Sequence, residues 1–133
     1  MRARQFIVED KKEDIVKMFS DFFPLAMNIL NLDRLPKIYF VGHLQHDVQP
    51  SFGEYREGEK ILTIALKNRH PNDILRTVAH ELVHFKQDLD GNLKDPNSGA
   101  TGSPQENEAN AVAGIIMRNF NKKYPQYISN TPI

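Results

Sequence analysis

The 133-residue chain contains no cysteine, and its charges balance at 17 basic against 17 acidic residues. The absence of cysteine excludes disulfides, cysteine-containing zinc sites and a cysteine nucleophile, and it is typical of a reducing compartment. The neutral charge balance gives no sign of a nucleic-acid partner or an anionic membrane surface. No apolar run approaches the length of about 20 residues that a bilayer span needs. We therefore expect a cytoplasmic protein with neither a membrane nor a nucleic-acid partner.

Apolar periodicity predicts three helices in one domain that covers residues 1–133. Residues 11–31 have apolar side chains at helical spacing, and Pro24 is a point at which this helix could kink or break. A second helix is predicted over 72–89 and a third from 104 to about 122, because turn-forming and capping residues bound both stretches. The intervening residues are rich in Gly, Pro, Asn and Ser and predict a loop.

Strand-forming residues lie between the first two predicted helices. Residues 37–41 are one predicted strand, and residues 51–56 and 60–66 flank a Glu-Gly-Glu turn and predict a β-hairpin. The stretch 61–66 is almost entirely apolar, which predicts a strand buried on both faces. The order of elements predicts an α+β fold with a small, mainly antiparallel sheet.

The stretch His80-Glu81-Leu82-Val83-His84 is an H-E-x-x-H motif within the second predicted helix. Side chains four residues apart lie on one face of a helix, so both imidazoles can reach one metal ion. Glu81 is turned by about 100° from His80, so it can flank the ion without binding it. A bound zinc lowers the pKa of a water molecule toward about 7, and Glu81 is placed to take the proton. The motif therefore predicts a catalytic metal site.

A catalytic zinc takes three protein ligands and keeps one position open. No histidine follows His84 and the chain has no cysteine, so the third ligand has to be a carboxylate. The third predicted helix carries two candidates, Glu106 and Glu108. Glu106 shares a helix face with small and apolar residues, whereas Glu108 points with basic residues toward solvent. We predict Glu106 as the ligand and keep Glu108 as the alternative.

The sequence around Glu106 also has a purely structural interpretation. Ser103 and Glu106 match a capping box, and Pro104 suits the first position of a helix. A capping glutamate needs no metal, and both interpretations predict the same helix start. Gln87 also has two interpretations. It lies one turn beyond His84, and it either supports that histidine or is exposed.

The two motifs together resemble those of the gluzincin metallopeptidases, in which an H-E-x-x-H helix is followed by a helix with an E-x-x-A-N/D pattern. The matching stretches here are His80-Glu81-Leu82-Val83-His84 and Glu106-Asn107-Glu108-Ala109-Asn110. The second stretch is most similar to that of ImmA/IrrE-type peptidases, and the first to that of small phage and bacterial zincins. The resemblance covers roughly residues 60–120, and the N-terminal third matches no motif.

The resemblance implies a zincin-like fold with Zn²⁺ as its cofactor. It implies His80, His84 and Glu106 as the zinc ligands and Glu81 as the general base. It also implies that Asn110 supports a ligand without binding the metal itself. A peptide substrate is expected to add as an extra strand at a sheet edge beside the histidine helix, and the hairpin 51–66 is the candidate for that edge.

These residues predict a zinc-dependent peptidase that acts on a peptide or protein substrate. One alternative is a zincin-fold regulatory or interaction module that binds zinc without significant turnover. Another is a zinc-free α+β protein in which both motifs are ordinary helix residues. Glu81 favours the enzyme, because a structural metal site needs no base. A further hypothesis is that residues 124–133 lie back in the cleft and keep the enzyme latent.

Overall fold

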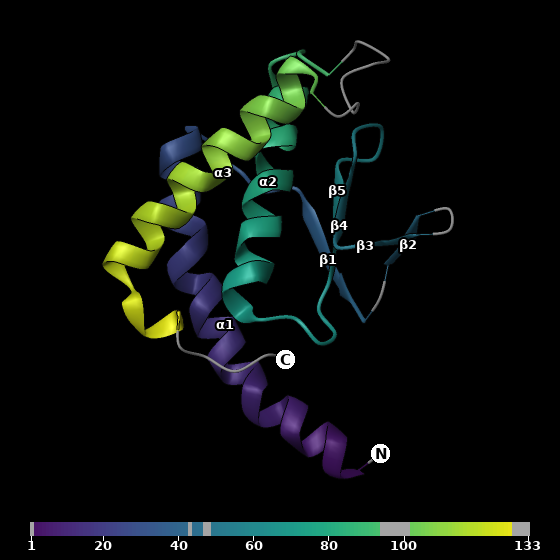
Figure 1. Ribbon diagram of the computed structural model, residues 1–133, viewed down its shortest axis with the longest axis vertical. Coiled ribbons are helices and arrows are strands. Elements are labelled where there is room, and N and C mark those ends of the chain that lie inside the picture. Colours follow the sequence, from purple (N-terminus) through teal and green to yellow (C-terminus); the bar gives the residue numbers. More distant parts are fainter. Residues whose placement is uncertain (1, 43, 47–48, 94–101, 129–133) are drawn as a thin grey trace.

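The computed structural model describes residues 2–42, 44–46, 49–93 and 102–128 and confirms an α+β fold. Helix α2 lies between the other two helices and the strands (Figure 1). The helices are α1 (Arg2–Leu30), α2 (Pro71–Leu89) and α3 (Pro104–Lys123), followed by the 3-10 turn η1 (Pro125–Tyr127). The strands are β1 (Lys37–Val41), β2 (Leu44–His46), β3 (Gln49–Ser51), β4 (Gly53–Arg56) and β5 (Ile61–Ala65). None of the helices within these ranges is long and apolar enough to cross a bilayer.

Helix α1 is longer than predicted and does not end at Pro24. Pro24 is exposed, while Phe22 and Ala26 on either side of it are fully buried. A proline inside a helix removes one backbone hydrogen bond, and the packing of these two neighbours on the core offsets that loss. The helix therefore remains one element from Arg2 to Leu30.

The main sheet has the strand order β1-β5-β4 and is mixed, so the prediction of a mainly antiparallel sheet is wrong. Strands β4 and β5 form the predicted hairpin and pair antiparallel, with Gly53 opposite Ile64. Strand β1 pairs with the other side of β5 in parallel, with Lys37 opposite Ile61. The chain leaves β1 through the separate β2–β3 ladder before it enters the hairpin, and this detour brings β5 back in the direction of β1.

Strand β5 is not buried on both faces, contrary to the prediction. Leu62 and Ile64 are fully buried, whereas Ile61 and Thr63, which alternate with them, are partly exposed. Successive side chains of a strand point to opposite faces, and all three helices lie on the same side of this sheet (Figure 1). One face therefore packs on the helices while the other stays open.

Helix α2 contributes seven of the 21 buried core residues that the structure describes and confirms the predicted span to within one residue. Its N-cap is His70, whose side chain accepts a hydrogen bond from the Asn72 backbone, with Pro71 in the first helical turn. The core that it shares with the other helices and β5 includes fully buried side chains from each element: Phe22, Leu62, Ile64, Leu75, Val78, Leu82, Ile116 and Phe120.

The hairpin is held on α2 by Asp88 near the helix end. The Tyr55 hydroxyl donates to Asp88 Oδ2 at 2.5 Å, and Lys60 Nζ lies 2.7 Å from the same oxygen. Tyr55 also packs edge-on against Phe85, with ring centroids 5.9 Å apart. Strand β4 therefore runs along the sheet-facing side of α2.

The described part of the C-terminal segment packs on the helices. Tyr127 stacks on Phe120, and its hydroxyl donates to Asp21 at 2.7 Å. This contact joins the end of α3 to α1. Residues 129–133, on which the latency hypothesis also depends, lie outside the described residues.

Candidate metal centre

Three predicted ligands meet between α2 and α3. His84 Nε2 lies 2.8 Å from Glu106 Oε2, and His80 Nε2 lies 3.1 Å from Glu106 Oε1. The two histidine Nε2 atoms are 3.2 Å apart. Among the residues that the structure describes, these three form the one group of His, Cys, Asp or Glu side chains close enough to share a metal ion.

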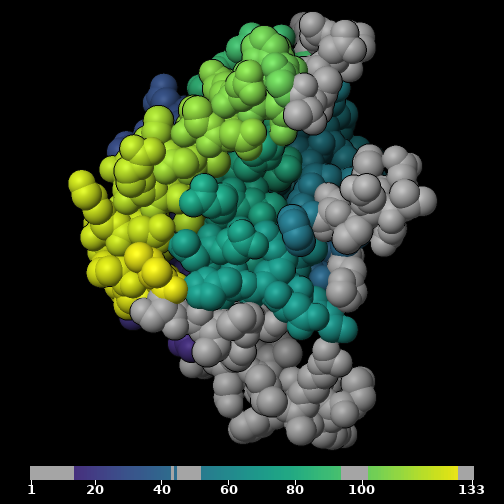
Figure 2. All heavy atoms as spheres, in the orientation of Figure 1, coloured from purple at the N-terminus to yellow at the C-terminus, as the bar shows by residue number. Residues whose placement is uncertain are grey.

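The group is partly open to solvent. The exposed fractions of the side chains are 21% for His80, 11% for His84 and 24% for Glu106. Helix α2 reaches the molecular surface in a strip between α3 and the strands (Figure 2). An ion and a small substrate group can therefore approach the three side chains without unfolding of the helices.

Local sequence signals place Glu106 in the first turn of α3. The Ser103 side chain accepts a hydrogen bond from the Glu106 backbone at 3.1 Å, and Pro104 occupies the first turn. The cap predicted from the sequence is thus present. The Glu106 carboxylate, however, turns to the two histidines of α2, so the cap and the histidine contacts coexist.

Gln87 orients His84. It is 2% exposed, and its Nε2 donates to the Gln105 carbonyl at 3.0 Å and to Glu108 Oε1 at 2.8 Å. Its Oε1 therefore accepts from His84 Nδ1, 2.8 Å away. A neutral imidazole with its proton on Nδ1 has a lone pair on Nε2, and this lone pair faces His80 and Glu106. Gln87 is therefore buried and in contact with His84, not exposed, and its supporting role stays a prediction.

Glu108 and Asn110 are on the same helix as Glu106 but do not belong to the group of three clustered side chains. Glu108 is exposed and is not one of the three clustered side chains; it accepts the hydrogen bond from Gln87 instead. The sequence predicted its solvent exposure but not this bond. Asn110, one turn after Glu106, makes a side-chain hydrogen bond with His80, as expected of a residue that supports a ligand.

Burial and neighbouring charges shift the pKa values of His80 and Glu81 in opposite directions. Burial lowers the pKa of His80 below its usual value, against the opposing effect of the Glu106 carboxylate. A neutral imidazole is the form that binds a metal. Glu81 is 8% exposed, and burial, with added repulsion from Glu106 and Glu54, raises its pKa to about 8.

Glu81 lies between the histidine side of α2 and strand β4. A Cβ atom built on Gly53 would lie 3.4 Å from Glu81 Cγ, which places this strand directly beside the predicted base. Strand β4 is at the edge of the three-stranded sheet and belongs to the hairpin that was the candidate for the substrate edge. The sequence suggested that the hairpin lies beside the histidine helix, but Gly53 and Glu54 could not be singled out, because neither belongs to the helical motifs.

No protein-family model matches the chain, and no curated protein or solved structure matches it either.

Proposed function

We propose that this chain is a zinc-dependent peptidase of the gluzincin kind, with a zincin-like domain. The observation that carries the proposal is the convergence of His80, His84 and Glu106 from two helices, with Glu81 buried beside them. Two imidazoles and one carboxylate, with a fourth position left for a small molecule, form a ligand set typical of catalytic zinc.

The spacing of the donor atoms supports zinc. Ligand atoms about 2.0–2.2 Å from one zinc in a tetrahedral site are about 3.3 Å from one another. The three pairs of atoms described above, in which each histidine faces a different oxygen of Glu106, are separated by 2.8, 3.1 and 3.2 Å. Small outward shifts of the side chains are enough to admit an ion.

Glu81 is the proposed general base. A bound zinc supplies a Lewis acid and lowers the pKa of a water molecule toward about 7. The same positive charge favours the ionised form of a nearby carboxylate, so Glu81 becomes able to accept a proton when the site is loaded. Its carboxylate then holds the proton and delivers it to the leaving amine.

Strand β4 is the proposed support for the substrate. An extended peptide that adds to a sheet edge gains main-chain hydrogen bonds. In an antiparallel ladder the backbone groups of alternate residues point away from the partner strand. Ala65 donates to the Phe52 carbonyl, so by this alternation the Tyr55 backbone groups point away from β5. Gly53, two residues earlier on the same strand, adjoins Glu81, so a peptide paired along β4 would extend toward this residue.

A cleavage assay with Glu81→Gln tests the proposal. Wild-type and variant protein, each loaded with one zinc, are incubated with a mixture of random peptides, and the products are read by mass spectrometry. We expect cleavage by the wild type and a loss on the order of 10²-fold or more in Glu81→Gln, with zinc retained. Glu57→Gln, in the exposed hairpin turn, is the matched control. Zinc binding without cleavage by the wild type would instead support a regulatory or interaction module.

We also propose a cytoplasmic location. The absence of cysteine is compatible with a reducing compartment. Fractionation of cells that express the full-length protein tests this, and recovery outside the cytoplasm would contradict it.

A further inference from the structure

Gly53 is the point of closest approach between strand β4 and α2. A Cβ atom added there would lie 2.6 Å from Thr77 Cγ2 and 3.3 Å from Ile64 Cδ1. Carbon atoms in contact are normally about 3.5–4.0 Å apart, so any side chain at this position would force a neighbouring group to shift. Thr77 is one helical turn before Glu81, which lies at 3.4 Å from the same added atom.

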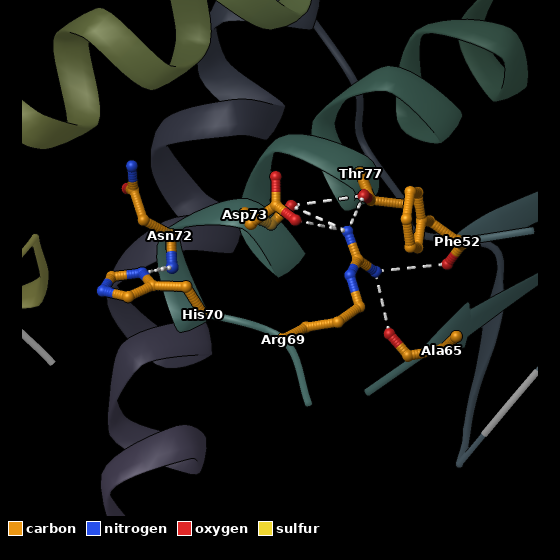
Figure 3. A network of polar contacts seen from close by, with 7 residues as sticks. All are labelled: Phe52, Ala65, Arg69, His70, Asn72, Asp73 and Thr77. Carbon is orange, nitrogen blue, oxygen red and sulfur yellow. Dashed lines mark hydrogen bonds and ion pairs between the residues drawn. The ribbon is translucent and has the colours of Figure 1, made fainter. Parts of the chain in front are cut away.

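The Thr77 methyl group cannot easily rotate out of this position. Its Oγ1 donates to the Asp73 carbonyl at 3.2 Å and accepts from Arg69 at 2.5 Å (Figure 3). A threonine in a helix has two accessible χ1 rotamers, but a change of rotamer would move the hydroxyl away from both partners. Arg69 therefore fixes the methyl group against Gly53.

Arg69 also holds the two strands at the level of Gly53. Its guanidinium donates to the Ala65 carbonyl at 2.8 Å and to the Phe52 carbonyl at 3.3 Å, and it lies 4.5 Å from the centre of the Phe52 ring. Phe52 and Ala65 are themselves joined by a backbone hydrogen bond. The arginine side chain is 5% exposed, and from one buried position its fork reaches Phe52, directly before β4, as well as β5 and α2 (Figure 3).

We propose that Gly53, Thr77 and Arg69 set the distance between the substrate-bearing strand β4 and Glu81. This role depends on the proposed peptidase function and adds positioning residues to it. A peptide paired with β4 takes its place from the backbone of that strand. The gap at Gly53 therefore decides how far the scissile bond lies from the base, and an error of about 1 Å in such a distance can cost on the order of 100-fold in rate.

A double-mutant cycle tests the steric contact. Gly53→Ala introduces the Cβ atom, Thr77→Ser removes the opposing methyl group but keeps the hydroxyl, and Thr77→Val keeps a methyl group but loses the hydroxyl. We expect Gly53→Ala to lower kcat by on the order of 10- to 100-fold with KM changed much less. Adding Thr77→Ser should restore most of the loss, and adding Thr77→Val should not. Gly58→Ala is the matched control, because a Cβ atom there meets nothing within 4 Å.

Arg69 is tested by Arg69→Lys, since a lysine cannot reproduce the forked contacts to both strands and the helix. We expect a fall in kcat with zinc content unchanged. Arg76→Lys, at an exposed position on α2, is the control. All rates are normalised to the amount of zinc-loaded protein, and they are measured at a temperature at which every variant is fully folded. These conditions separate misplacement of the substrate from loss of folded protein.

The outcomes separate this inference from the proposed function. An active wild type with an equally active Gly53→Ala variant, or a Gly53→Ala loss that Thr77→Ser does not relieve, overturns the positioning role and leaves the peptidase intact. A zinc-loaded wild type that cleaves no peptide overturns both. Loss of kcat in Gly53→Ala and Arg69→Lys, with recovery through Thr77→Ser, supports the role.

Discussion

The two ends of helix α3 carry opposite kinds of side chains. Where α3 begins, Glu106 meets His80 and His84 of α2, and all three are partly open to solvent. Where α3 ends, fully buried apolar side chains such as Ile116 and Phe120 join the core. Helix α3 thus has a polar, partly open beginning and a buried, apolar end.

The difference shows how a small domain can carry a polar site. Polar groups removed from water cost free energy unless they are hydrogen-bonded or bind a metal. At the polar end this requirement is met by a chain of contacts from Glu108 through Gln87 to His84. At the apolar end burial itself stabilises the contact. The predictions below test whether the two ends can be disturbed separately.

The largest effect on stability is expected at the apolar end. Phe120→Ala removes a fully buried ring that packs edge-on against Phe22, and we expect the free energy of unfolding to fall by about 3–5 kcal/mol. Chemical denaturation measures this change, and the folded fraction should still bind zinc. A loss of less than about 1 kcal/mol would contradict the division between the two ends.

Zinc should stabilise the protein through the polar end alone. With free zinc at about 100 times its Kd, the gain in unfolding free energy is about 2.7 kcal/mol, and a chelator should abolish it. His84→Ala should unfold at the same temperature with and without zinc in a thermal melt. Equal responses to zinc in the wild type and His84→Ala would contradict the assignment of this residue.

Gln87 should affect zinc affinity more than it affects stability. Gln87→Leu keeps the approximate volume but removes the acceptor that orients His84, and such partners of a ligand are typically worth about 10- to 100-fold in metal affinity. Competition with a chelating dye measures the Kd. Gln126→Leu, an exposed position, is the control, and equal affinities for both variants would count against the orienting role.

The smallest effect is a pH dependence of the zinc-free protein. The pKa of Glu81 is raised to about 8 by burial, with added repulsion from Glu106 and Glu54, so the folded state retains a proton that the unfolded chain has lost. This contribution to stability is complete below the unfolded pKa and disappears as the pH rises toward 8. The lowered pKa of His80 changes the stability in the opposite direction as the pH rises, and this change is complete by about pH 7.

Between about pH 7 and about pH 8.5 the unfolding free energy of the chelated protein should therefore fall, by at most about 1.4 kcal/mol per pH unit. Glu81→Gln should remove this fall, and denaturation at a series of pH values measures it. A wild-type slope that survives in the variant would assign the titration to another group.

The helical part of the site could be predicted because it depends on local periodicity. The spacing of His80, Glu81 and His84 fixes their directions on one helix, and the faces of the third helix separated Glu106 from Glu108. The structure brings Glu106 to the histidines, as that argument required. The same logic predicted the hairpin, since its turn residues lie between two runs of strand-forming residues.

Contacts between distant segments could not be predicted in this way. The parallel pairing of β1 with β5 depends on the path of the intervening chain, and the bond from Gln87 to Glu108 joins two helices. Gly53 and Arg69 belong to no motif, and their proximity to the site follows from the packing of the hairpin on α2. A single sequence contains no periodic signal for such tertiary contacts.

The central claim is that His80, His84 and Glu106 hold one zinc ion, and metal content tests it most directly. The full-length protein, purified without a metal-affinity tag, is analysed by mass spectrometry beside His84→Ala, Glu106→Ala and Glu108→Ala. We predict about one zinc per chain in the wild type and in Glu108→Ala, as one catalytic site binds one ion, and a loss of zinc in the other two variants. A wild type that takes up no zinc even after reconstitution, or a Glu106→Ala variant that keeps it, would contradict the claim.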